Sequence, residues 1–152
     1  MATVLAACSK GNAPVFDADL RYHAVYKTGD FSYSCTIVKE NGVISITPTS
    51  TNAAGMTISC DGKTVTFQKE DLIKSYDMNT IDSTNPAVLL YEVFRYLDDT
   101  ETLNVGSVGE LREVSGKTSV GNFTLTLNSD DTLNTLSVPA AMISVIFEEK
   151  AS

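Results

Sequence analysis

Apolar and polar residues alternate with a period of two along most of the chain from residue 19 onward. Leu20, Tyr22, Ala24 and Tyr26 share one face of a first segment, and the same spacing returns in the segments that follow. Because successive side chains of a β-strand point to opposite sides, this pattern predicts strands with one buried and one solvated face. We expect strands over about 18–27, 30–39, 42–48, 55–61 and 63–68, with a looser edge segment at EDLIKSYDM.

Turn-forming pairs separate these segments at short intervals. Asn41-Gly42 and Asp61-Gly62 tolerate the positive φ that tight hairpin turns require, so VKENGVISI and SCDGKTVTF are typical of hairpins. Ser115-Gly116 is interpreted in the same way. These turns predict an antiparallel meander.

The period changes to that of a helix in STNPAVLLYEVFRYLDD. Asn85 suits the N-cap and Pro86 the first helical position, where the missing N–H of proline is not needed. Apolar residues then recur at helical spacing, and strand-like alternation returns in TLNVGSV, ELREVSG, NFTLTLNS, TLNTLSVP and MISVIFEEK. The chain is therefore predicted to be an α+β protein, in which a curved antiparallel sheet of about 9–10 strands wraps one central helix.

The length and charge of the chain limit its organisation and its partners. A chain of 152 residues fits one folded domain, which we place at residues 18–152, after a flexible tether at residues 1–17 that contains SKGNAP. The net charge of −8, with no cluster of Lys or Arg, argues against binding to nucleic acid. No apolar run approaches the roughly 18 residues of a membrane helix.

The sequence carries no recognisable catalytic or metal-binding motif. His23, the one histidine, falls on the solvated face of its strand, and no nucleophile motif accompanies it. The two GKT triplets lack the upstream glycine of a phosphate loop and are interpreted as hairpin turns, and NSDDTLN lacks the glycine and glutamate of a calcium loop. We therefore predict no enzyme activity, no cofactor and no metal site.

Two of the three cysteines allow two interpretations. Cys35 and Cys60 each end an alternating apolar series, so both are expected on the buried face. They are either two free thiols in the core or a disulfide formed in an oxidising compartment.

The third cysteine, Cys8, follows a short apolar stretch. Leu5-Ala6-Ala7-Cys8 resembles a lipobox, in which an aliphatic residue and two small residues precede a cysteine that becomes the acylated N-terminus. The basic and most of the apolar part of a signal peptide are absent before it, so the stretch is interpreted as a signal-peptide remnant, with a chance match as the alternative.

Taken together, the Cys8 motif, the meander DADLRYHAVYKTGDFSYSCTIVKENGVISITPTS, the hairpin GMTISCDGKTVTFQ, the helix and the closing strands resemble the lipoprotein-carrier (LolA/LolB-like) superfamily over about residues 18–150. The resemblance implies an unclosed half-barrel that curls around a helical plug and holds acyl chains in the hollow between them. Carriers of this family commonly have more than one helix near the sheet, whereas one is predicted here. The residues that the resemblance implies as lipid-facing are Tyr33, Ile37, Ile44, Ile46, Ile58, Val65, Phe67, Leu90, Val93, Phe94 and Leu97.

The first functional hypothesis is an envelope lipoprotein, exported and anchored to the membrane through a lipid on Cys8, that binds a lipid or a lipidated partner. The alternative is a structural or protein-interaction lipoprotein with a solid core and no ligand. Both hypotheses place the protein outside the cytoplasm.

Overall fold

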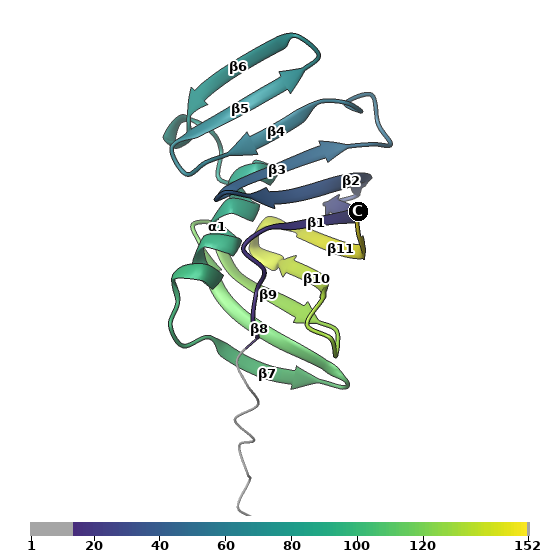
Figure 1. The fold of residues 1–152 in the computed structure, drawn as a ribbon, viewed down its shortest axis with the longest axis vertical. Coiled ribbons are helices and arrows are strands. Elements are labelled where there is room, and N and C mark those ends of the chain that lie inside the picture. Colours follow the sequence, from purple (N-terminus) through teal and green to yellow (C-terminus); the bar gives the residue numbers. More distant parts are fainter. Residues whose placement is uncertain (1–13, 152) are drawn as a thin grey trace, which may run out of the picture.

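The computed structural model describes residues 14–151, and these form one open antiparallel sheet with one long helix on its inner face (Figure 1). The N-terminal strands are β1 (Leu20–Thr28), β2 (Phe31–Glu40), β3 (Val43–Pro48), β4 (Thr57–Cys60), β5 (Thr64–Lys69) and β6 (Leu72–Asp77). A short 3-10 helix, η1 (Met78–Thr80), and the helix α1 (Pro86–Asp99) follow. The C-terminal elements are β7 (Asn104–Val108), β8 (Leu111–Thr118), β9 (Gly121–Leu127), β10 (Leu133–Val138), η2 (Pro139–Ala141) and β11 (Ile143–Lys150).

The sheet consists of two meanders that are joined at its centre. Its strand order is β6-β5-β4-β3-β2-β1-β11-β10-β9-β8-β7, so the first strand pairs with the last one. The chain leaves one edge at β6, crosses the inner face as α1 and enters the opposite edge as β7, as Figure 1 shows. Since β6 and β7 do not pair, the sheet remains unclosed. The predicted fold class is confirmed, with eleven strands instead of about nine or ten.

The helix begins where its capping residues predict. The side chain of Asn85 accepts hydrogen bonds from the backbone N–H groups of Ala87 and Val88, and Pro86 occupies the first turn. The apolar side of the helix packs on the inner face of the sheet, chiefly against β3, β4 and β8. Its buried residues are Ala87, Val88, Leu89, Leu90, Val93, Phe94 and Leu97. This contact forms the centre of the hydrophobic core.

Two of the predicted turns differ in outcome. Asn41 and Gly42 both have positive φ, at 53° and 77°, and connect β2 to β3 as a tight hairpin. Ser115-Gly116, by contrast, lies inside β8, so the turn predicted there, and for the second GKT triplet, is wrong. Gly116 instead allows two aromatic rings to pack directly against the backbone of β8. A Cβ at this position would lie 2.4 Å from the ring of Tyr96 and 2.5 Å from that of Phe123.

The disulfide interpretation of Cys35 and Cys60 is wrong in this structure, because both are buried free thiols. Cys35 lies on β2 and Cys60 on β4, with β3 between them. Neighbouring strands lie about 4.8 Å apart, so residues two strands apart are separated by about 10 Å or more. A disulfide requires Cα atoms within about 7 Å.

Candidate functional site

The residues implied as lipid-facing all belong to the core that the inner face and the helix form. Of the eleven, Tyr33, Ile58 and Phe67 are half-buried, and the other eight are buried. The structure therefore brings them together, but mainly as packed core. Only Phe67, Ile44 and Phe94 reach the wall of either pocket described below. Their role in ligand binding stays a prediction.

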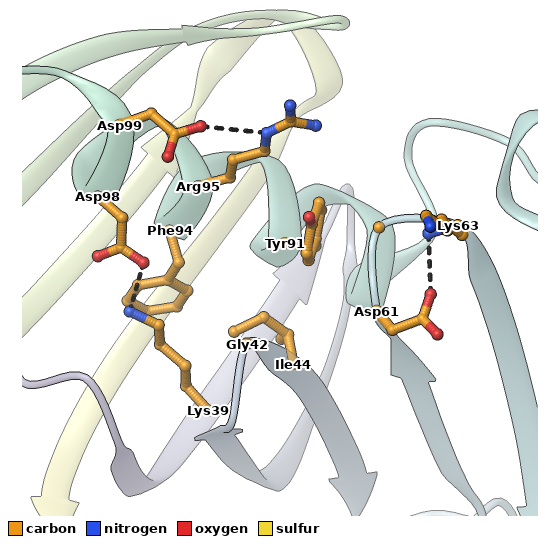
Figure 2. Close-up of a pocket in the computed structure, with 11 residues that line it drawn as sticks. Lys39, Gly42, Ile44, Asp61, Lys63, Tyr91, Phe94, Arg95, Asp98 and Asp99 are labelled. Carbon is orange, nitrogen blue, oxygen red and sulfur yellow. Dashed lines mark hydrogen bonds and ion pairs between the residues drawn. The ribbon is translucent and has the colours of Figure 1, made fainter.

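One pocket, of about 370 Å³, lies between the C-terminal half of α1 and two hairpin turns of the sheet (Figure 2). Lys39 of β2 extends along its wall, and its Nζ lies 2.7 Å from Oδ2 of Asp98 on the helix. The same ammonium lies 5.7 Å from the centroid of the Phe94 ring. Among residues 14–151, Lys39 is the buried charged side chain, whereas the side chain of Asp98 is 46% exposed.

Two further charged side chains of this pocket, Arg95 and Asp61, interact with groups of the chain itself. Arg95 pairs with Asp99 one helical turn later, at 3.3 Å. The carboxylate of Asp61 accepts hydrogen bonds from the backbone N–H groups of Lys63 and Thr64, which lowers its pKa. The pocket thus presents a balanced set of charges, and its ion pair ties the helix to β2.

The second pocket is an apolar groove of about 520 Å³ at the β6 edge of the sheet. Its volume is in the usual range of small-molecule sites, about 300–1,000 Å³. It is lined by Met56, Phe67, Gln68, Lys69, Leu72, Ile73, Lys74, Tyr76 and Ile81. We call this set the apolar groove.

Strand register shows which side chains of the apolar groove share the inner face with the helix. Residues directly opposite each other in an antiparallel pair point to the same side of a sheet. Val65 is buried on the inner face and pairs with Tyr76, so the pairs Phe67 with Lys74 and Lys69 with Leu72 also lie on that face. The rings of Phe67 and Tyr76 meet edge to face at 5.8 Å. Most of the apolar groove therefore lies on a part of the inner face that α1 does not cover, whereas Gln68 and Ile73, which pair with each other, belong to the outer face.

Exposed apolar side chains mark this end of the sheet. Leu72 is 77% exposed and Tyr76 44% exposed on the inner face, and Ile73 is 59% exposed on the outer face of the same strand. Large apolar groups gathered in this way typically mark an interaction or ligand site. Sequence reasoning missed Leu72 and Tyr76 because EDLIKSYDM was treated as a loose segment, although the alternation Leu72, Lys74, Tyr76 continues the strand period.

Buried or half-buried titratable groups lie on the inner face of β1, β2 and β4. Tyr26 and Tyr33 stack at 5.5 Å between centroids, and burial raises the pKa of each hydroxyl above its ordinary value. Burial also raises the pKa of the Cys35 thiol to about 12, and that of Cys60 above its ordinary value. Thiols in this state are poor nucleophiles, since the thiolate is the reactive form.

Several predictions fall outside the described residues or concern absences. Cys8 and most of the predicted tether, residues 1–13, lie outside the part that the structure describes. Within residues 14–151, no helix has the length and apolar character needed to cross a membrane. The same residues contain no group of three or more His, Cys, Asp or Glu side chains arranged to hold a metal ion.

Comparisons with known proteins give similarities among solved structures. No family model matches the chain, and no curated protein matches it. Among solved structures, it is similar to a LolA superfamily protein from Nitrosomonas europaea, with a TM-score of 0.41 and 9% identity over 90% of this chain and 87% of the other. That protein belongs to the superfamily that the sequence motifs resemble, but a similarity of this degree identifies neither a family nor a ligand for this chain.

Proposed function

We propose that this protein is a binding protein, not an enzyme, and that its apolar groove takes up the acyl chain of a lipid or of a lipidated partner. The observation that carries the proposal is the uncovered inner face at β4 to β6, where Leu72 and Tyr76 are exposed beside Phe67. When an apolar ligand covers such side chains, their apolar surface leaves water, and this lowers the free energy of the complex.

The free energy available is sufficient for measurable affinity. Burial contributes about 0.8 kcal/mol per methylene, so half-burial of a ten-methylene chain contributes roughly 4 kcal/mol. This corresponds to a Kd of about 1 mM for the chain alone, and contacts of an attached group would strengthen it.

A dansyl-labelled undecanoic acid tests the proposal, because dansyl emission rises in an apolar environment. We expect saturable enhancement with the wild-type protein and weaker binding by Leu72→Ser, by about fivefold. Leu72 is 77% exposed, so this substitution should not affect folding. Val108→Ser is the matched control, since Val108 is 52% exposed on the opposite edge strand, β7. No enhancement with the wild type, or equal effects of both variants, would contradict the proposal.

We further propose that the natural protein is an envelope lipoprotein that carries a lipid on Cys8. The support is the lipobox-like stretch Leu5-Ala6-Ala7-Cys8. Cells that export the protein behind a lipoprotein signal sequence would be fed an alkyne analogue of palmitate, and the purified chain would be examined for label. Label on the wild type and none on Cys8→Ser is expected, whereas an unlabelled wild type would show that Cys8 is not acylated.

The packed core under the helix favours the second candidate, an interaction protein without a ligand. Leu90, Val93 and Phe94 are buried with at most 2% exposure, so the helix leaves no hollow at its centre. If the dansyl probe does not bind, the exposed strands β6 and β7 become the candidate contact surfaces for a protein partner.

A further inference from the structure

Two exposed lysines line the apolar groove. Lys69 and Lys74 lie on the inner face of β5 and β6, where all neighbouring inner-face residues of β4 to β6 are apolar or aromatic except Cys60. Lys74 is directly opposite Phe67, and Lys69 is directly opposite Leu72. Lys69 and Lys74 are therefore diagonal neighbours on adjacent strands. The backbones of such neighbours lie about 7–8 Å apart, so the two lysine side chains can reach one common group.

Neither lysine forms an ion pair in the part of the chain that the structure describes. The ammonium of Lys39, in the first pocket, pairs with Asp98 at 2.7 Å. No ion pair is formed by Lys69 or Lys74 within residues 14–151, although Glu70 and Asp71 form the turn between them. The apolar groove therefore combines an apolar wall with two cationic groups that form no ion pair among the described residues.

We propose that the occupant of the apolar groove is a free fatty acid, with its chain on Phe67, Leu72 and Tyr76 and its carboxylate held by Lys69 and Lys74. The inference rests on the proposed function and adds the chemical class of the ligand. Charge complementarity carries the inference. The chain has a net charge of −8, which repels anions in general, yet two positively charged side chains, Lys69 and Lys74, line the apolar groove. Lysine stems also extend the apolar wall while the ammonium groups remain at its rim.

A single acyl chain suits the apolar groove better than a membrane surface does. The pocket has a volume of about 520 Å³ and is formed by the inner face of only a few strands, β4 to β6, together with Ile81. Inward-facing lysines can also protect an edge strand from pairing with another sheet. That role makes a different prediction, namely that loss of the lysines changes the oligomeric state without changing ligand preference.

The experiment compares dansyl-undecanoic acid with its methyl ester, which has the same chain and an uncharged head. At neutral pH and low salt, the wild type should bind the acid about tenfold more tightly than the ester, as expected for charge-assisted contacts to a carboxylate. Lys69→Met with Lys74→Met should remove this preference and retain binding of the ester. The matched control, Lys27→Met with Lys117→Met, removes the same charge from two exposed lysines outside the apolar groove and should retain the preference.

Each outcome has a separate meaning. If neither probe binds the wild type, the proposed function itself fails. The acid and the ester could bind equally, or the preference for the acid could survive in the variant that lacks both Lys69 and Lys74. In either case the groove binds apolar chains, but the proposal that the two lysines hold a carboxylate is overturned. Sedimentation with phosphatidylglycerol vesicles provides the last arm: binding to vesicles that depends on both lysines, without acid preference in solution, would identify a membrane surface as the occupant and overturn the fatty acid.

Discussion

The ion pair between Lys39 and Asp98 predicts a strongly unequal effect of removing its two partners. Asp98→Ala leaves the buried ammonium of Lys39 without a counter-charge. Removing one partner of a buried pair typically costs about 3–5 kcal/mol, and because water reaches the half-exposed side of Asp98 we expect the low end, about 3 kcal/mol. Lys39→Met removes the buried charge, keeps an apolar stem near Phe94 and leaves a carboxylate that water can solvate, so it should cost about 1 kcal/mol or less.

Urea unfolding followed by far-ultraviolet circular dichroism measures these effects, since the chain contains no Trp. In the double variant the unpaired ammonium is absent, so its loss of stability should match that of Lys39→Met, which corresponds to a coupling energy of about 3 kcal/mol. Asp99→Ala is the control, because its exposed pair with Arg95 should contribute about 0.5 kcal/mol or less. Additive effects of the two single changes, or a greater loss for Lys39→Met than for Asp98→Ala, would refute the reasoning.

Three further predictions follow from packing and burial. Gly116→Ala should cost about 1–3 kcal/mol in the same assay, because its methyl group has no room beneath two rings, and an unchanged midpoint would contradict that packing. Phe94→Ala should cost about 3–5 kcal/mol as a core truncation, whereas a loss under 1 kcal/mol would indicate a cavity wall. Burial raises the pKa values of Cys35, Tyr26 and Tyr33, so the neutral groups stabilise the folded state at every pH below their ordinary pKa values. This stability is lost as the pH rises from the ordinary pKa toward the pKa in the folded protein. For Cys35, that pH window runs from 9.0 to about 12. Spectrophotometric titration should accordingly show tyrosines that ionise late in the folded protein, and a single ordinary transition would contradict their burial.

Local patterns in the sequence predicted the elements well because the physics that forms them is local. Alternation located β1 to β5, and Asn41-Gly42 fixed a hairpin through backbone conformations that few other pairs adopt. Asn85 and Pro86 placed the start of the helix to the residue. The burial of Lys39 was visible in the same alternation, since it continues the series Cys35, Ile37, but its partner Asp98 lies 59 residues away.

The groove and the strand order could not be derived in the same way, because they depend on contacts between distant segments. The pairing of β1 with β11 decides that β6 becomes an edge, and no local pattern encodes it. The position of α1 across β3, β4 and β8 then decides which inner-face residues are covered. For this reason the implied lipid-facing residues became mostly core, while the exposed apolar residues of β6 escaped notice.

The most direct test of the account is an amide NMR titration of the isotopically labelled protein with decanoate. If the apolar groove is the binding site, the shifted resonances should cluster in β4 to β6 and around Ile81, and those of β7 to β9 should remain in place. Shifts centred on the ion-pair pocket beside Lys39 or on the buried tyrosines, or no shifts at all, would contradict it.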